Sequence, residues 1–145
     1  MTAGSPALLV TRVGAERYGF DVAEVREIVA IDRVAHVPTL SPAVRGVMPR
    51  RERHVSLVNL ASLLSGAPPP FETSAAAVVV TTGGADLALE VDEVESVVDG
   101  GAEFVSGAVA GGIPARGVWR CGTYLVTVLD ARLLAERVTA LQGER

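Results

Sequence analysis

The chain has 145 residues, of which 49% are hydrophobic, and its formal net charge is −4. This length suits one ordinary core, or two small barrels that share an interface, and is too short for two independent enzyme domains. The longest apolar run, residues 75–80, is far shorter than the roughly 20 residues of a membrane span, and the acidic balance disfavours a nucleic-acid-binding surface.

The N-terminal stretch MTAGSPALLVTR lacks the basic segment of a signal peptide, so a cytoplasmic location is expected. Cys121 is the only cysteine, which leaves no intramolecular disulfide and no cysteine-rich metal site. We expect Cys121 to serve as a small buried hydrophobic residue.

Two stretches of the chain resemble each other, FDVAEVREIV at 20–29 and LEVDEVESVV at 89–98, and they lie 69 positions apart. The similarity extends backwards through 10–29 and 79–98. A second block repeats with an offset of 71, since RGV and VSLVNL in the first half recur as RGV and VTVLDA in the second. Two ordered blocks in both halves indicate an internal duplication, which predicts two similar structural units.

Each half begins with the pattern of a β-hairpin. Alternation in YGFDV and LALEV predicts two strands whose inward faces carry Tyr18, Phe20 and Val22, and Leu87, Leu89 and Val91. The preceding GAER and GGAD supply the glycines that a tight hairpin requires. VAEVREIV and VDEVESVV follow, with valines typical of a strand but at helical spacing, so we predict a short helical turn that leads into a strand.

Prolines 38, 42 and 49 separate short β-rich runs, as in a small barrel with bent edges. The segment RGVMPRRERH at 45–54 holds four arginines in ten residues and is either a solvated loop or a protein-binding loop. The segments SGAPPPFETSA at 65–75 and DGGAEFVSGAVAGGIPA at 99–115 are predicted to be loops, the first of them linking the repeats.

The last element predicted is a C-terminal amphipathic helix over DARLLAERVTALQ, residues 130–142. It opens with a capping aspartate, and one face carries Leu133, Leu134, Val138 and Leu141. The helix is expected to end before Gly143.

No catalytic constellation or metal site is evident in the sequence. His36 and His54 lack metal-ligand spacing, and no GxSxG motif or phosphate-binding loop is present. The acidic pairs Glu24 with Glu27 and Glu93 with Glu95 are more simply solvated positions between buried valines. We therefore expect no enzyme activity, no metal and no cofactor.

The order of these motifs resembles that of the CheW-like domain family, the adaptors of bacterial chemosensory arrays. YGFDVAEVREIV, VPTLSPAVRGVM, an arginine and VSLVNL follow one another as in the family's first half, which passes through xVxEI to GxxNLRGxxxPxxDL. The second half matches the family's VDxV strand and its terminal LLDxxxLL stretch. The resemblance covers nearly the whole chain.

The resemblance implies an all-β fold with a C-terminal helix, built as two intertwined, pseudo-symmetric, five-stranded SH3-like β-barrels with a shared apolar interface. We expect one CheW-like domain over 1–145, divided into repeat one (about 7–64), a linker (about 65–75), repeat two (about 76–129) and the terminal helix (about 130–142).

The resemblance also implies a non-enzymatic role, because CheW-like proteins couple methyl-accepting chemotaxis receptors to a CheA-type histidine kinase. Val25, Glu27 and Ile28 match the VxEI segment, which the family associates with kinase contact. Gly46 and Val94 match positions associated with receptor contact. Alternative roles stay open for these residues. Val25, Ile28 and Val94 are core residues in the alternative interpretation, and Gly46 is only a turn residue.

The chain departs from the family where PRRE, residues 49–52, replaces NLRG. Arg51 keeps the family's arginine, but Glu52 replaces a glycine and would reach its backbone conformation at a cost of about 1 kcal/mol. The loops around Pro68 and Gly111 are also short. This corner is expected to be rebuilt, with weakened or lost kinase contact.

We therefore expect a divergent adaptor that is recruited to chemosensory arrays, binds the cytoplasmic tip of a receptor and contacts the kinase more weakly. Other CheW-like proteins are further candidate partners. One alternative is a CheW-like module that targets another signalling protein. A small β-barrel enzyme is a second alternative, and it would need a convergent polar pocket.

Overall fold

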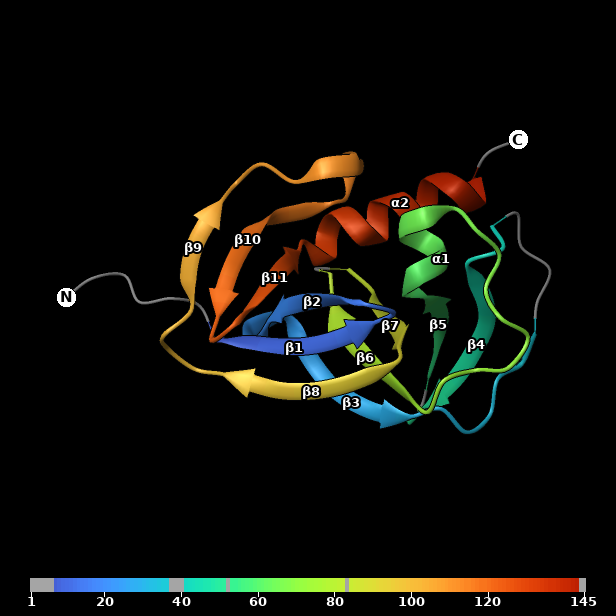
Figure 1. Ribbon diagram of the computed structural model, residues 1–145. Coiled ribbons are helices and arrows are strands. Elements are labelled where there is room, and N and C mark those ends of the chain that lie inside the picture. The colour runs from blue at the N-terminus through green and yellow to red at the C-terminus, as the bar shows by residue number, and fades with distance from the viewer. Residues whose placement is uncertain (1–6, 37–40, 52, 83, 144–145) are drawn as a thin grey trace.

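The computed structural model describes residues 7–36, 41–51, 53–82 and 84–143 (Figure 1). In chain order the elements are β1 (Leu8–Val13), β2 (Glu16–Asp21), the 3-10 turn η1 (Val22–Glu24), β3 (Val25–Ala30), β4 (Val44–Arg50), β5 (Arg53–Asn59), α1 (Leu60–Ser65), β6 (Ala76–Thr81), β7 (Asp86–Val91), β8 (Glu93–Val98), β9 (Glu103–Ser106), the 3-10 turn η2 (Ala110–Gly112), β10 (Ala115–Cys121), β11 (Tyr124–Leu129) and α2 (Ala131–Gly143).

The strands form two sheets, and each sheet takes strands from both halves of the sequence. The six-stranded sheet has the order β8-β1-β2-β11-β10-β9, and the five-stranded sheet has the order β3-β6-β7-β5-β4. The first hairpin, β1–β2, therefore pairs with strands of repeat two, and the second hairpin, β6–β7, pairs with strands of repeat one. This exchange intertwines the repeats and confirms the expected mostly-β fold with a C-terminal helix. Among the described residues, however, the end strands of each sheet do not pair with each other, so the sheets are not closed barrels, and one sheet has six strands instead of five.

The exchange follows the internal repeat in register as well as in order. β5 pairs with β7 in parallel, with Ser56 opposite Leu87, and β11 pairs with β2 in parallel, with Thr127 opposite Tyr18. Offsets of 69 for the hairpins and 71 for the later strands convert one pairing into the other. The duplication read from the sequence is thus a pseudo-twofold relationship in space.

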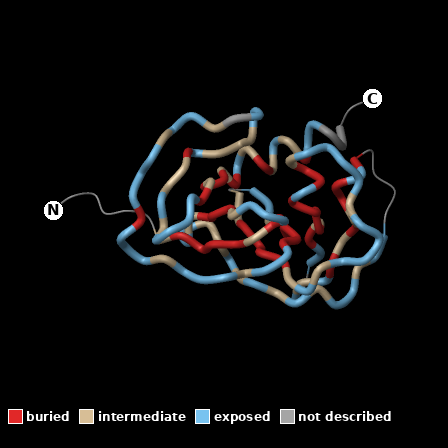
Figure 2. The backbone as a smooth tube through the Cα atoms, in the orientation of Figure 1, coloured by how far each residue is buried: buried red, intermediate tan, exposed pale blue. Residues whose placement is uncertain are grey.

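The core divides in the way that two barrels with a shared interface require. The largest apolar cluster takes residues from both sheets and both helices, including the fully buried Phe20, Leu89, Leu60 and Leu134. Two smaller clusters belong to single sheets, one around Leu57 and one around Val126. Figure 2 shows the buried backbone concentrated in the middle of the molecule.

Several local predictions are confirmed. In repeat one a single helical turn, η1, leads into β3, and Asp21 caps it by accepting a hydrogen bond from the backbone N–H of Ala23. In repeat two the same prediction is wrong, because only Asp92 separates β7 from β8 and it forms no helical turn. The C-terminal helix is present as α2, although it includes Gly143 and so does not end before that residue as predicted. Asp130 caps it by accepting a hydrogen bond from the backbone N–H of Leu133. Leu134 and Val138 are buried on its inner face.

Three details were predicted wrongly. Val22 does not share the inward face of Tyr18 and Phe20, because the chain turns into η1 there and leaves Val22 exposed. The stretch 99–115 is not a plain loop, since β9 within it adds a sixth strand to one sheet. Helix α1 was not predicted at all, although Asn59 caps it through a hydrogen bond from the backbone N–H of Ser62.

A buried ion pair joins the two repeats and holds the chain between them. The Arg45 guanidinium contacts the Glu90 carboxylate, and the two side chains are only 6% and 1% exposed. Arg45 also donates to the backbone carbonyl of Pro70 at 2.8 Å, and the backbone N–H of Ser74 donates to Glu90. Residues 66–75, which carry no helix or strand, are thereby fixed onto the barrel.

The same junction occurs at the equivalent place in the other repeat, but it is open to solvent. Arg116, equivalent to Arg45, contacts Asp21, equivalent to Glu90, at 3.3 Å. Its side chain is 36% exposed and also contacts Glu24 at 2.5 Å and Asp130 at 3.6 Å. Partial burial lowers the pKa of Arg116, but the three carboxylates outweigh this effect and leave that pKa above its ordinary value.

Candidate protein-interaction surface

The three residues matched to the family's kinase-contact segment lie on β3, an edge strand of the five-stranded sheet. Among the described residues β3 pairs only with β6, so its other edge carries no strand. Ile28 is 48% exposed. Val25 is half-buried and packs against the main core. β3 thus presents one apolar side chain to solvent and anchors another, which is the arrangement of an edge available for binding.

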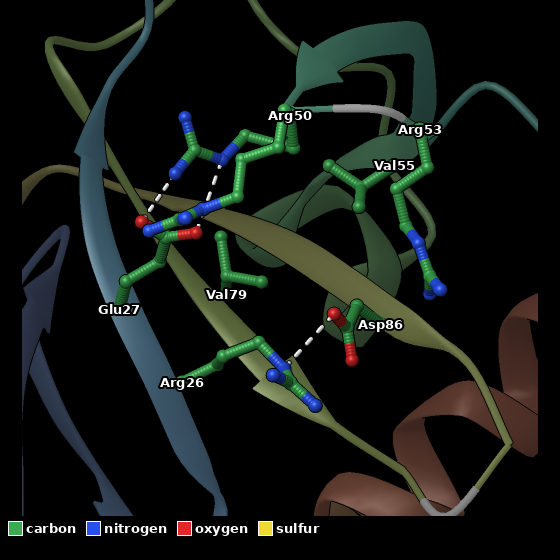
Figure 3. A pocket seen from close by; sticks show the side chains of 8 residues that line it. Arg26, Glu27, Arg50, Arg53, Val55, Val79 and Asp86 are labelled. Atoms are coloured by element: carbon green, nitrogen blue, oxygen red, sulfur yellow. Dashed lines mark hydrogen bonds and ion pairs between the residues drawn. The ribbon is translucent and has the colours of Figure 1, made fainter.

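Glu27, the third of these residues, forms an ion pair with Arg50 of β4 (Figure 3). Arg50 Nε donates to Glu27 Oε2 at 3.2 Å. This hydrogen bond, with the positive charges of Arg50, Arg51 and Arg26, holds the pKa of Glu27 below its ordinary value. Glu27 is therefore ionised at neutral pH and positions the Arg50 side chain across the sheet.

The Glu27–Arg50 pair lines a hollow of about 690 Å³ that we call the arginine hollow. It lies between β3, the β4–β5 hairpin and the β6–β7 hairpin (Figure 3). Its lining consists of Arg26, Glu27, Arg50, Arg51, Arg53, Val55, Val79 and Asp86. Val55 and Val79 are buried and form an apolar floor beneath the charged side chains.

The arginine hollow is positively charged although the protein is acidic. Among the described lining residues, four arginines against Glu27 and Asp86 give +2, whereas the whole chain carries −4. Arg26 pairs with Asp86 at 3.0 Å. Arg51 and Arg53 have no ion-pair partner in the part of the chain that the structure describes.

A second hollow of about 500 Å³ occupies the equivalent place in the six-stranded sheet, and we call it the tyrosine hollow. Every lining position of the arginine hollow has its repeat equivalent here, and these equivalents are Glu95, Ser96, Cys121, Gly122, Tyr124, Val126, Val10 and Arg17. The guanidinium of Arg17 lies 3.5 Å from the centre of the Tyr124 ring. Cys121, which was expected to be buried, is only partly buried, and this partial burial raises the pKa of its thiol. The two hollows are therefore lined from equivalent positions, but none of the four arginines of the arginine hollow has an arginine as its equivalent.

Each hollow contains an ion pair at equivalent positions, but the acidic and the basic partner have exchanged places. In the arginine hollow Arg26 of β3 contacts Asp86 of β7, and in the tyrosine hollow Glu95 of β8 contacts Arg17 of β2 at 2.8 Å. The register of β3 and of β8 shifts at these two residues, so both belong to β-bulges. The bulge aims each side chain at the neighbouring hairpin.

Arg51 has a left-handed backbone, with φ of 56°. Arg50 pairs with Arg53, so only two residues join β4 to β5. The equivalent position in repeat two is Gly122, with φ of 63°. Glu52, which was expected to bear the conformational cost, lies outside the described residues, and the left-handed residue that the structure describes in this corner is Arg51.

The two residues matched to receptor contact lie in different sheets, so the structure does not bring them together on one element. Gly46 of β4 is buried at a β-bulge with φ of 153°, and a Cβ there would lie 2.2 Å from the carbonyl oxygen of Ala35. Val94 of β8 is half-buried and packs against the main core. Both residues therefore contribute to the packing of the fold as well as to the surface near them.

The sequence reasoning singled out the arginines of 45–54 as one group, but the structure separates them. Arg45 is buried in the ion pair with Glu90, whereas Arg50, Arg51 and Arg53 line the hollow. An alignment of RRER with its repeat equivalent CGTY would have signalled the difference. A large exposed apolar set on the six-stranded sheet was also missed, namely Val97, Phe104, Val105, Tyr124 and Leu125.

The described residues contain no group of three or more histidine, cysteine, aspartate or glutamate side chains that could hold a metal ion. No helix in the same part of the chain is long and apolar enough to cross a membrane. The surfaces that stand out are therefore the free β3 edge and the two hollows.

Comparison with known proteins agrees with this architecture. A family model described as the CheW-like domain matches residues 7–139. The crystal structure of the scaffolding protein TtCheW from Thermoanaerobacter tengcongensis is similar with a TM-score of 0.77 and 16% sequence identity, over 89% of this chain and 91% of that one. A comparison with curated proteins finds no match.

Proposed function

Because the chain belongs to the CheW-like domain family, we propose that it is an adaptor that binds the cytoplasmic tip of a methyl-accepting chemotaxis receptor and the regulatory domain of a CheA-type histidine kinase. The observation that carries this proposal is β3, an edge strand with an exposed apolar side chain, Ile28, at the segment that the family uses for its kinase. The adaptor would act in the cytoplasm, at chemosensory arrays, and other CheW-like proteins would be further partners there.

The kinase would bind along β3. An edge strand offers unpaired backbone N–H and C=O groups to a strand of a partner barrel, and Ile28 offers an apolar anchor beside them. Glu27 would act indirectly, because its carboxylate is already held by Arg50. Residues 49–52 depart from the family's sequence in the hairpin next to this edge, so we propose that the contact along β3 differs from that of typical family members and is weaker.

The receptor would bind through a different part of the molecule, around Val94 on β8. Gly46 would support this contact without touching the receptor, because it is buried and lets residues 31–36 pack closely against β4. The bridge between Ala35 and Val47 holds that packing. A receptor helix would thus meet an apolar surface at Val94, whereas Gly46, in the other sheet, would act only through the packing of the fold.

The experiment that tests the adaptor role is calorimetry of the full chain with a receptor cytoplasmic tip and, separately, with a kinase regulatory domain. Replacing Ile28 with arginine should weaken kinase binding by about tenfold or more, because it puts a charge at an apolar contact. Val97 occupies the equivalent place in repeat two and is 59% exposed, so Val97→Arg is the matched control and should bind the kinase normally.

For the receptor, the conservative pair Val94→Thr and Val25→Thr is suitable. The two valines are repeat equivalents, both half-buried and both packed against the main core, so the two substitutions should destabilise the fold by similar amounts. Only Val94→Thr should weaken receptor binding. Absence of binding to both receptor and kinase would overturn the adaptor role and favour a CheW-like module that targets another signalling protein.

A further inference from the structure

The arginine hollow contains more positive charge than the fold uses. Arg50 forms an ion pair with Glu27, and Arg26 forms one with Asp86. Arg51 and Arg53 form no ion pair with a carboxylate of the described residues. Arg26 is itself 58% exposed despite its ion pair. Because like charges repel, four guanidiniums around two carboxylates are a cost to the folded protein unless something else binds them.

The backbone at Arg51 indicates that this charge is retained for a purpose outside the fold. The left-handed conformation strains any residue with a side chain, and repeat two places Gly122 in the same hairpin position. Glycine would relieve the strain and would also remove one positive charge from the hollow. Strain that persists beside unpaired charges is typical of a functional site.

The chemistry of the hollow fits carboxylates presented by a protein. A guanidinium binds a carboxylate through two parallel N–H donors, and all 13 basic residues of this chain are arginine. The buried Val55 and Val79 form an apolar floor for a small hydrophobic side chain between the acids. This combination of apolar floor and charged rim matches the anatomy of a protein interface.

Nucleic acid fits less well. Its binding sites track a phosphate backbone along an extended basic face and stack bases on aromatic rings. The described residues that line the hollow carry a charge of only +2, and none of them is aromatic. The chain as a whole carries −4 and would repel a polyanion outside the hollow.

We propose that the arginine hollow is a recognition site for an acidic segment of a partner protein, in which two carboxylates bind Arg51 and Arg53 and an apolar side chain lies over Val55 and Val79. The identity of the partner rests on the proposed function, because the acidic segment would belong to the protein that docks at β3. The equivalent tyrosine hollow lacks these arginines and does not share the role.

The test is a binding titration of the full chain, at low and high salt, with a short capped peptide in which glutamates flank a central leucine. A matched peptide with glutamines in place of the glutamates should bind at least about tenfold more weakly. Arg53→Gln and Arg51→Gly should each weaken binding of the acidic peptide by about tenfold, and added salt should weaken the remaining binding. Arg132→Gln on α2, at an exposed ion pair far along the chain, changes the net charge equally and should have less than about a twofold effect.

Four binding results would overturn the proposal. They are no binding of the acidic peptide at about 1 mM, equal binding of the glutamine peptide, an equal loss in Arg132→Gln, and tighter binding of a single-stranded oligonucleotide that the same arginine variants abolish. Concentration-dependent self-association that is lost in Arg53→Gln would assign the hollow to a second copy of the chain and would also overturn it. If the peptide binds but receptor and kinase do not, the hollow stands and the adaptor role fails. If the kinase binds but the peptide does not, the adaptor role stands and the hollow is not its recognition site.

Discussion

Arg51 and Gly122 occupy the same position in the two equivalent hairpins, and both have a left-handed backbone, with φ of 56° and 63°. One repeat has thus kept the residue that suits the turn, and the other has placed an arginine there. In repeat one the arginine faces the hollow beside β3. Glycine is thus the residue that the turn favours, and the arginine at the equivalent position is the residue that a partner would bind.

Replacing Arg51 with glycine should stabilise the protein by about 0.5–1 kcal/mol. Relief of the left-handed strain is worth roughly 1–2 kcal/mol, and the extra freedom of glycine in the unfolded chain returns about half of it. Urea denaturation measures the change. The reverse substitution at the equivalent position, Gly122→Arg, should destabilise by about 1 kcal/mol, and a destabilised Arg51→Gly would show that the Arg51 side chain is structural.

The fold could be predicted from the sequence because its signals are local. Alternating apolar residues and hairpin glycines repeat at fixed offsets, so the sequence alone predicts the duplication. α1 was missed because a six-residue helix has too few turns to show periodicity. β9 was missed because its apolar side chains, such as Phe104, are exposed and its flanks are rich in glycine.

The interaction surface could be predicted only in part. The segment that contains Ile28 was found through its motif, but the hollow beside it depends on strands that come from both repeats. The exchanged ion pairs of Arg26 with Asp86 and of Glu95 with Arg17 likewise connect residues far apart in sequence. No local pattern reports which hairpin pairs with which strand, so these partners required the structure.

The exchanged ion pairs should differ in strength according to their exposure. Arg17 and Glu95 are 21% and 23% exposed, whereas Arg26 is 58% exposed. A double-mutant cycle with Arg17→Gln and Glu95→Gln should give a coupling free energy of about 0.5–1 kcal/mol, and a cycle at Arg26 and Asp86 should give about 0.3 kcal/mol or less. Equal couplings would mean that exposure does not set the strength here.

The two inter-repeat junctions provide a matched pair for the effect of burial. Arg45→Ala should destabilise by about 3–5 kcal/mol, because it leaves the Glu90 carboxylate buried without a counter-charge. Arg116→Ala, at the equivalent but solvent-exposed position, should cost only about 1 kcal/mol. Denaturant unfolding of both variants measures the difference. The double variant Arg45→Met with Glu90→Leu should recover much of the loss, and a failure to recover would indicate that the linker contacts dominate.

The pKa of Glu27 gives a direct readout of its ion pair. A folded-state pKa below the unfolded value means that Glu27 stabilises the folded protein at neutral pH, and that this stabilisation is lost as the pH falls through the folded pKa. In an NMR titration the Glu27 carboxyl should titrate below an ordinary glutamate. Arg50→Gln should move the pKa upward, since it removes the hydrogen bond that is the largest single cause of the shift. An unchanged pKa in that variant would assign the shift to Arg51 and Arg26.

Gly46 should prove to be a structural residue whose loss weakens receptor binding indirectly. Gly46→Ala forces a Cβ to within 2.2 Å of the Ala35 carbonyl oxygen at a φ of 153°, so the 31–36 segment must move away from β4. We expect a loss of about 2 kcal/mol or more in the free energy of unfolding, with weaker receptor binding. Gly84→Ala is the control, because nothing lies within 4 Å of the place its methyl group would take and its backbone is not left-handed, so stability should be nearly unchanged. A Gly46→Ala protein with an unaltered melt and lost receptor binding would instead place Gly46 in direct contact with the receptor.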